Sequence, residues 1–351
     1  MEAVRNMLKP ILSKVVRSDA WRIALIAVGW LVLISALHSW LNAADSSRKT
    51  VRIGYMPVIT NLAVPLLDYA TREGNGIRFQ AVKFASFAEM AESLRNGSIQ
   101  AAFMIAPLSI MLRQQGEDVK IVYIGNRHES TMVARKALQA DGLEDLIGKT
   151  LAVPMRYSGH NLGVLRLLEE EGLSGQVNIV EMNPPDMASA LAAGSLDAYF
   201  VGEPFAAQTL KNGEATLLYY VEEFWKDFIC NLAVVKGSLI EEDPETVRLL
   251  VEGAARSGLW ARKHKKEAAK IATRYWNQPQ DLVEYALDTP PGRIVYDRFV
   301  PKEAELQDMA DLMVRFGLLK NGDIDGLVED RFARRVGNPT ISTVADIIPK
   351  P

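Results

Sequence analysis

The sequence predicts an α/β protein made of two similar lobes and preceded by one hydrophobic helix. Three observations predict this class: an apolar segment near the N-terminus, an internal repeat at a spacing of 97 residues, and alternating helix-like and strand-like patterns in both copies. At 351 residues the chain also exceeds the usual size of a single hydrophobic core, which favours more than one folded part.

Residues 23–41 form a mostly apolar segment of 19 residues, which is just long enough to span a bilayer as a helix. Five basic residues lie before it, so the positive-inside rule predicts that the chain from residue 42 onward is outside the cytoplasm. Asn42 stands where a signal-peptidase site needs a small residue. We therefore assign residues 1–44 to a basic leader with a retained signal anchor, and a cleaved signal peptide is the alternative.

The internal repeat relates residues 94–107 (LRNGSIQAAFMIAP) to residues 191–204 (LAAGSLDAYFVGEP). Each copy predicts a helix that ends at a glycine, a short buried strand, and a turn at a proline that begins another helix. The segments before and after each copy also correspond, so each lobe is expected to hold a mostly parallel sheet covered by helices. Two such lobes predict a cleft between them.

The second lobe is expected to span residues 131–228. The first lobe is expected to be discontinuous, with residues 50–130 joined by residues 229–345, because the C-terminal part is predominantly helical and shows no third sheet. The chain then crosses between lobes near 126–134 and 221–229, and these segments are candidate hinges. Local patterns further predict a capping box from Ser86 to Glu89 and an N-cap at Asp186.

Composition excludes several classes of protein. The body has no Lys/Arg cluster, the whole chain carries a net charge of −3, and no nucleic-acid-binding module is visible, so no nucleic acid is expected as a partner. Cys230 is the only cysteine, which excludes an intramolecular disulfide, a lipoprotein anchor and a metal site built from several cysteines. The four histidines have no metal-ligand spacing and no catalytic motif is present, so neither a cofactor nor an enzymatic activity is expected.

Four stretches of the chain resemble the nitrate, sulfonate, taurine and bicarbonate binding proteins of ABC transporters. They are residues 51–55 (VRIGY), 96–101 (NGSIQA), 153–168 and 183–205, and the resemblance extends from about residue 51 to 335. It is strongest at 183–205, where a Pro-Pro pair precedes a Gly-Ser-hydrophobic-Asp-Ala segment and an acidic-Pro-aromatic turn.

The resemblance implies a type II periplasmic-binding-protein fold and a role as the substrate-binding component of an ABC importer. Such a protein captures a small anionic solute in the interlobe cleft and delivers it to a permease and its ATPase. We expect it on the periplasmic or extracellular face of the cytoplasmic membrane, attached through residues 23–41. A binding protein for a thiamine-precursor pyrimidine is the alternative; a pyrimidine synthase-like enzyme is disfavoured because that branch is associated with a Cys-rich motif.

Ligands of parallel α/β sheets bind beyond the carboxyl ends of strands, where helix N-termini present unpaired N–H groups. The polar side chains of the loops in this position are candidate ligand-binding residues. These candidates are Thr60, Asn61, Ser109, His128, Ser130, Arg156, Ser158, His160, Asn161 and Glu203. The resemblance implies that Ser158 contacts an oxyanion, and Arg156 is expected to hold a negative charge. Helix capping or a solvated surface position is the alternative at each of these residues.

Overall fold

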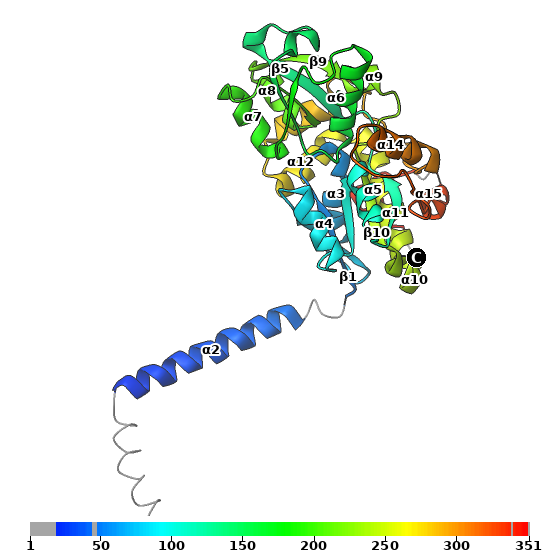
Figure 1. Cartoon of the computed structure of the whole chain (residues 1–351). Coiled ribbons are helices and arrows are strands. Elements are labelled where there is room, and N and C mark those ends of the chain that lie inside the picture. The colour runs from blue at the N-terminus through cyan, green and yellow to red at the C-terminus, as the bar shows by residue number, and fades with distance from the viewer. Residues whose placement is uncertain (1–18, 44–47, 338–339, 350–351) are drawn as a thin grey trace, which may run out of the picture. The chain divides into compact units, whose positions relative to one another are not determined.

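The computed structural model describes residues 19–43, 48–337 and 340–349 (Figure 1). The chain divides into two compact units between Lys49 and Thr50. In the first unit, helix α2 (Asp19–Ala43) contains the predicted apolar segment. Its span Trp21–Ser39 has a mean hydropathy of 1.8, and the side chains of residues 21–39 are exposed. By length and composition this helix can cross a membrane, as an anchor or a signal sequence does.

The second unit contains two five-stranded sheets, and we call each sheet with its covering helices a lobe. The first sheet has the strand order β2-β1-β3-β10-β4. Its strands are β1 (Thr50–Tyr55), β2 (Arg78–Lys83), β3 (Ala101–Ile105), β4 (Val119–Ile124) and β10 (Asn231–Lys236). The helices between them are α3 (Ala63–Thr71), α4 (Phe87–Arg95) and α5 (Ala106–Gln114).

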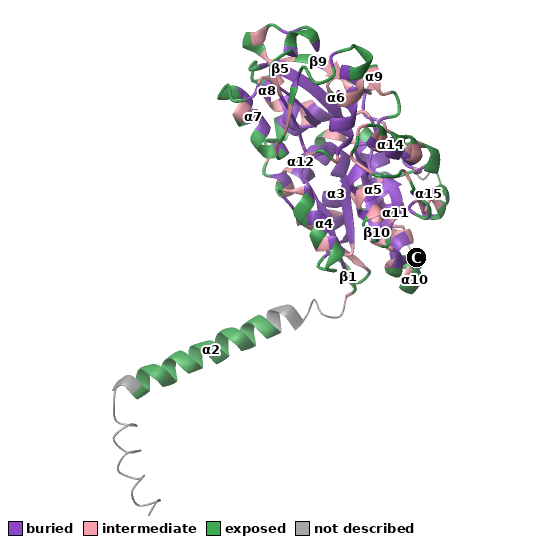
Figure 2. Cartoon of the chain, in the orientation of Figure 1, coloured by how far each residue is buried: buried purple, intermediate pink, exposed green. Residues whose placement is uncertain are grey.

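The second sheet repeats this arrangement with the order β7-β6-β8-β5-β9. Its strands are β5 (Ser130–Arg135), β6 (Thr150–Val153), β7 (Asn178–Glu181), β8 (Ala198–Gly202) and β9 (Ala215–Tyr220). Its helices are α6 (Gly159–Glu170), α7 (Pro184–Ala192), α8 (Phe205–Lys211) and α9 (Val221–Phe224). Figure 2 shows the strands of both sheets buried beneath helices whose outer faces are exposed.

The predicted repeat is confirmed down to the backbone. Gly97 and Gly194 end the corresponding helices α4 and α7, and each has a φ of +78°. The strands that follow, β3 and β8, are buried at all five positions. One difference lies at the prolines, because Pro107 lies in the first turn of α5, whereas the peptide bond between Glu203 and Pro204 before α8 is cis.

Neither sheet is wholly parallel. Strand β1 pairs in parallel with β2 and β3, but β10 pairs antiparallel with β3 and β4. In the second sheet β5 likewise pairs antiparallel with β8 and β9. Both β5 and β10 enter their sheet from the other lobe, and each runs opposite to its neighbours in the sheet.

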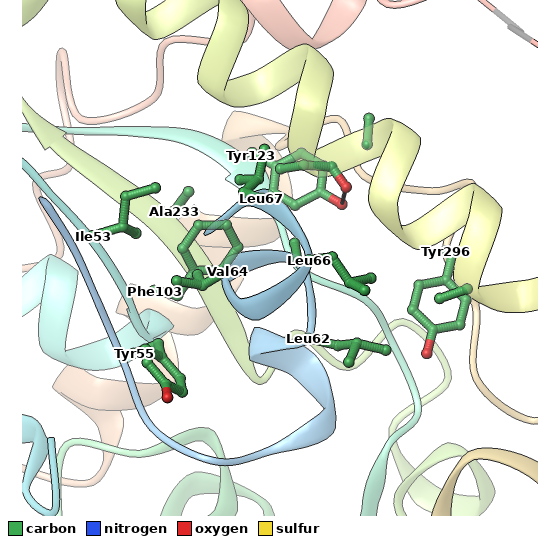
Figure 3. Close-up of a cluster of buried hydrophobic side chains, with 14 of the residues drawn as sticks. Ile53, Tyr55, Leu62, Val64, Leu66, Leu67, Phe103, Tyr123, Ala233 and Tyr296 are labelled. Carbon is green, nitrogen blue, oxygen red and sulfur yellow. Dashed lines mark hydrogen bonds between the residues drawn. The ribbon is translucent and has the colours of Figure 1, made fainter. Parts of the chain in front are cut away.

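The C-terminal part is helical, as predicted, and packs on the first sheet. Its helices are α10 (Gly237–Glu242), α11 (Pro244–Lys263), α12 (Lys265–Trp276), α13 (Gln280–Asp288), α14 (Glu303–Arg315) and α15 (Arg331–Arg334). Single 3₁₀ turns lie at η1 (Ile59–Asn61), η2 (Lys136–Leu138), η3 (Glu144–Leu146) and η4 (Val344–Asp346). Helix α3 contributes Val64, Leu66 and Leu67 to the apolar core, beside Phe103 and Ala233 of the sheet (Figure 3).

Three segments of chain lie side by side where the lobes meet. The first joins β4 to β5, the second joins α9 to β10, and the third belongs to the C-terminal part. Arg127 of the first segment forms bridges with Ile229 of the second and with Val295 of the third. The two predicted crossings therefore have a third partner that the sequence pattern did not indicate.

Candidate functional site

The polar residues that follow β1 are buried at the boundary between the lobes. Asn61 is fully buried, and its Nδ2 donates to the carbonyl oxygens of Met56 and Phe103, both at 3.2 Å. Its Oδ1 accepts a hydrogen bond of 2.8 Å from Asn231 Nδ2. Because all of these partners belong to the first lobe, Asn61 holds the loop after β1 against the sheet.

Thr60 lies next to Asn61, and its hydroxyl has a different environment. Its side chain is buried, and Oγ1 has no hydrogen-bond partner among the described residues. The backbone of Thr60 packs directly on Gly125, where a Cβ atom would lie 2.1 Å from the Thr60 carbonyl oxygen. Asn126 follows; its Nδ2 donates to the Ile59 carbonyl at 3.1 Å, while its buried Oδ1 has no partner in the described part of the chain.

On the second lobe, Ser158 begins helix α6 as its N-cap, with its Oγ accepting a hydrogen bond of 3.1 Å from the Asn161 backbone N–H. The Asn161 side chain donates to the Arg156 carbonyl at 2.9 Å, which closes the preceding loop. A Cβ atom on Gly159 would lie 2.8 Å from the Phe228 ring, so a glycine is needed at this contact. These contacts turn His160 toward the interior.

His160 is 2% exposed and packs edge-on against the rings of Phe200 and Phe228. Its Nε2 lies 3.0 Å from Ser130 Oγ, and its Nδ1 has no partner among the described residues. Burial lowers the pKa of His160 to about 3, so the imidazole is neutral at physiological pH. The ring therefore presents one unpaired nitrogen inside the protein.

Glu129, which is not among the candidates predicted from the sequence, lies beside Ser130 and is fully buried. Its Oε1 accepts from Ser130 Oγ at 3.1 Å, and its Oε2 accepts from the Glu203 backbone N–H at 2.8 Å. Burial raises the pKa of Glu129 to about 7. We call Asn61, Glu129, Ser130, His160, Glu203, Cys230 and Asn231 the interlobe cluster.

Glu203 has no free carboxylate oxygen for a ligand in this structure. Its Oε1 accepts from Thr131 Oγ1 at 2.7 Å, and its Oε2 accepts from the Ala207 backbone N–H at 2.7 Å. The Glu203 backbone carbonyl also accepts a hydrogen bond of 2.7 Å from Ile59 N–H. Because Ile59 follows β1 and Glu203 follows β8, this bond joins the two lobes directly.

Arg293 is a second buried residue that sequence reasoning missed. It is 8% exposed and comes from the C-terminal segment, yet its partners lie in the second lobe. Its Nε donates to Glu222 at 2.8 Å, its Nη1 donates to Thr131 Oγ1 at 2.9 Å, and its Nη2 donates to the Ser130 carbonyl. The guanidinium also lies 4.2 Å from the centre of the Tyr220 ring.

Three predicted candidates lie apart from these contacts. The Arg156 side chain is 62% exposed, and its Nε donates to Glu181 at 2.8 Å. His128 is half-buried and bonds to the Lys226 carbonyl, and the Ser109 hydroxyl donates to the carbonyl of Ile105, the last residue of β3, at 3.4 Å. Of the remaining seven, the structure brings Ser130, His160 and Glu203 together around Glu129. Thr60 and Asn61 lie in the loop after β1, and Ser158 and Asn161 bond to their own neighbours at the start of α6. A ligand-binding role for all ten stays a prediction.

A pocket of about 240 Å³ opens between the lobes beside Arg156 and its partner Glu181. Ser86, Phe87 and Ala88 line it from the first lobe; Pro154, Met155, Glu181, Met182 and Asn183 line it from the second. A larger pocket of about 640 Å³ lies between α6 and α14, but it is lined by charged surface residues and shares none with the interlobe cluster. The smaller pocket lies between the two copies of the repeat.

Two equivalent sheets with crossing strands and a polar boundary define the fold of the type II periplasmic binding proteins. The nitrate-binding protein NrtA from Synechocystis PCC 6803 matches with a TM-score of 0.75 at 14% identity, over 82% of this chain and 88% of that one. The alkanesulfonate-binding protein SsuA from Xanthomonas axonopodis pv. citri bound to MOPS matches with a TM-score of 0.67 at 20% identity, over 81% of this chain and 99% of that one.

Residues 44–275 match the NMT1-like family, and the chain therefore belongs to that family. In sequence it is 26% identical, over 216 residues, to the taurine-binding periplasmic protein of Escherichia coli K12. That match covers 60% of this chain and 66% of the relative, which is just under two thirds of the relative's length. The family resemblance predicted from the sequence is thus confirmed.

Proposed function

We propose that this chain is the extracytoplasmic substrate-binding component of an ABC importer and that it carries out no chemistry on its ligand. It captures a small anionic solute of the nitrate, sulfonate/taurine or bicarbonate class between its lobes and delivers it to a permease. The lobes are residues 50–130 with 229–345, and residues 131–228. Family membership and the names of the relatives support the class of ligand.

One observation carries this proposal: both lobes contain buried polar atoms that have no hydrogen-bond partner within the described residues. Thr60 Oγ1 belongs to the first lobe, His160 Nδ1 belongs to the second, and Asn126 Oδ1 lies on the crossing between them. A buried polar atom without a hydrogen bond costs about 1–3 kcal/mol. A solute that bonds to atoms of both lobes removes this cost only when the lobes are together, so it stabilises the closed form.

The test is thermal unfolding of the full chain in detergent micelles with nitrate, bicarbonate, ethanesulfonate or taurine, and with a hydroxymethylpyrimidine as the uncharged comparison. A ligand at a hundredfold excess over its Kd adds about 2.7 kcal/mol to the stability of the folded form. For a body of this size, that raises Tm by about 4 °C. If no anion of the panel raises Tm, the proposed ligand class is wrong.

Two buried threonines, Thr60 and Thr209, allow the thermal-unfolding test to be tied to the proposed ligand site. Thr60→Val removes a hydroxyl without a partner, so the free protein keeps its Tm or gains slightly, while the ligand-induced shift is reduced. Thr209 is equally buried, but its Oγ1 bonds to the Tyr199 hydroxyl at 2.6 Å and to the Ala206 carbonyl at 3.2 Å. Thr209→Val therefore lowers the Tm of the free protein and preserves the ligand-induced shift. A full shift in Thr60→Val contradicts the site.

A further inference from the structure

Glu129, Ser130 and His160 form a chain of hydrogen bonds that ends at His160 Nδ1, an atom with no partner in the part of the chain that the structure describes. Ser130 Oγ lies 3.1 Å from Glu129 Oε1 and 3.0 Å from His160 Nε2. All three side chains are 2% exposed or less. Because the hydroxyl has a single proton, the bond it makes to one neighbour determines the bond it makes to the other.

The direction of this chain depends on the protonation state of Glu129. When the carboxylate is ionised, Ser130 donates to Glu129 and accepts from His160 Nε2–H, which leaves Nδ1 as an acceptor. When the carboxyl group carries a proton, that proton lies on Oε1, since Oε2 accepts from the Glu203 N–H at 2.8 Å. Glu129 then donates to Ser130, Ser130 donates to His160 Nε2, and the imidazole proton moves to Nδ1.

We propose that Glu129 is a specificity-determining residue of the solute site. Through Ser130, it sets whether His160 Nδ1 donates or accepts a hydrogen bond. When an anion binds, the protein therefore takes up one proton with it. This inference rests on the proposed function. The proton balance is simple. One proton is added at His160 Nδ1, the Nε2 proton moves to Ser130 Oγ, and the Ser130 proton moves to Glu129 Oε1. No other reactant is needed.

The charges around Glu129 favour its protonation when an anion binds. Glu203 faces it from the turn before α8, and Arg293 faces it from the C-terminal segment. Arg293 is already bonded to Glu222, and its Nη1 lies 4.0 Å from Glu203. Arg293, the cation that lowers the pKa of Glu129, is thus shared with Glu222 and lies near Glu203. An anion beside ionised Glu129 meets a second uncompensated negative charge, which protonation of Glu129 removes.

Glu129 titrates near neutral pH, so its protonation can change together with anion binding under physiological conditions. Burial raises the pKa of Glu129 to about 7; the Glu203 charge acts in the same direction, and the Cys230 thiol, Ser130 hydroxyl and Arg293 act against it. Burial also raises the pKa values of the two other facing groups, Cys230 and Tyr296, so both stay protonated. His160 stays neutral, so it changes tautomer and not charge.

The experiment is nitrogen-15 NMR of the full chain in detergent micelles, labelled at its four histidines, at pH 5.5 and pH 8.5. A His160→Gln variant assigns the His160 signals. The wild type should show the Nδ1–H tautomer at pH 5.5 and the Nε2–H tautomer at pH 8.5. The same tautomer at both pH values overturns the proposal.

Glu129→Gln should fix the acid form at every pH. The Glu203 N–H selects the amide oxygen for the Oε2 position, so the amide NH₂ faces Ser130 and donates to it, as protonated Glu129 does. His160 then holds Nδ1–H at both pH values. Glu222→Gln is the comparison, because Glu222 contacts Arg293 but is not part of the chain of hydrogen bonds; it should keep the switch, with its midpoint at a lower pH because Arg293 is then freer to stabilise ionised Glu129. A Glu129→Gln variant that still switches with pH overturns the proposal.

Binding supplies a second readout, with nitrate and ethanesulfonate as the probes. For a group that titrates near pH 7, affinity for the anion should fall about tenfold between pH 6 and pH 8 in the wild type and stay constant in Glu129→Gln. An equal pH dependence in both proteins contradicts the linkage. If neither anion binds at either pH, the proposed function fails, and the tautomer measurement still decides the role of Glu129.

Discussion

At the scale of single residues, Glu129 and His160 affect stability in opposite directions as the pH changes. The folded-state pKa of Glu129, about 7, exceeds its ordinary value of 4.5, so the folded protein binds more protons between these values and its stability falls as pH rises. The folded-state pKa of His160, about 3, is below its ordinary value of 6.5, so stability rises with pH across that range. The two effects oppose each other between pH 4.5 and 6.5.

Comparison with Glu129→Gln isolates one of these effects. The contribution of His160 is present in both proteins and cancels in the difference. The free energy of unfolding of the wild type, minus that of Glu129→Gln, should fall on the order of 3 kcal/mol between pH 4.5 and pH 7.5. Urea unfolding followed by tryptophan fluorescence measures it. A difference that does not change with pH would mean that Glu129 is not held protonated by burial.

Arg156 and Ser158 are neighbours in one loop but differ in environment. Arg156 is exposed and paired with the exposed Glu181, so Arg156→Ala should change the Kd for the solute by at most about threefold. Ser158 caps α6, so Ser158→Ala should cost about 1 kcal/mol of stability and loosen the helix that carries His160. Calorimetry and urea unfolding measure the two effects. A Kd raised a hundredfold in Arg156→Ala would place its guanidinium on the ligand.

The loops of the candidate site could be predicted from the sequence, but not all of its residues could. Thr60, Ser158 and His160 could be predicted because they follow strands, and strand ends are visible in the sequence. Arg293 could not, because its burial depends on Glu222, which is 71 positions away, and no local pattern encodes that contact. Glu129 lies in a predicted crossing, but only the packing of its carboxylate on Gly202 shows that it is fully enclosed.

At the scale of helices and strands, the repeat and the glycines that end its helices were predictable from the sequence. The residues that cap the helix N-termini were not. The repeat places glycines at the ends of α4 and α7 because a left-handed residue ends each helix. The capping box at Ser86 is wrong, since that side chain makes no cap hydrogen bond, and the N-cap of α7 is Asn183 and not Asp186. The two prolines after Asn183 start the helix earlier, as their fixed φ favours the first turn.

The equivalence of the repeats can be tested at these glycines. A Cβ atom meets no atom within 4 Å at Gly97 and only the tip of Arg135, at 4.0 Å, at Gly194. Gly97→Ala and Gly194→Ala should therefore each cost about 1–2 kcal/mol, from the left-handed backbone alone. Gly337→Ala is the control, because among the described residues its Cβ also meets no atom within 4 Å and its φ lies outside the left-handed range. Clearly unequal losses in the first two variants, measured by urea unfolding, would contradict the equivalence.

At the scale of the whole molecule, the apolar helix α2 bears on where the chain resides. Its span Trp21–Ser39 has the length and composition of a membrane-crossing helix, which a signal sequence near the N-terminus also has. We expect the full-length chain to remain in the membrane fraction after carbonate washing, with its body accessible from outside the cytoplasm. Intact-mass measurement of the fractions is the check. A soluble form that begins near residue 44 would show that the segment is cleaved.

The two-lobed arrangement was predictable because a repeat in sequence becomes a repeat in space. The contacts that join the lobes were not, since they depend on tertiary packing. They include the Ile59 to Glu203 backbone bond and the Arg293 contacts of the third segment. These bonds join the lobes in this structure, and we propose that the lobes close in this way around an anion.

Distance measurement between two spin labels by electron paramagnetic resonance tests closure around an anion most directly. Spin labels on Glu89→Cys in α4 and Asp186→Cys in α7 report across the interlobe pocket, and Cys230 is buried, which limits its labelling. Without ligand, the distances should be broad and long. With a saturating amount of the anion that raises Tm most, they should narrow to one shorter distance, and Thr60→Val should need far more anion for the same change. An identical distance distribution with and without the bound anion would contradict closure.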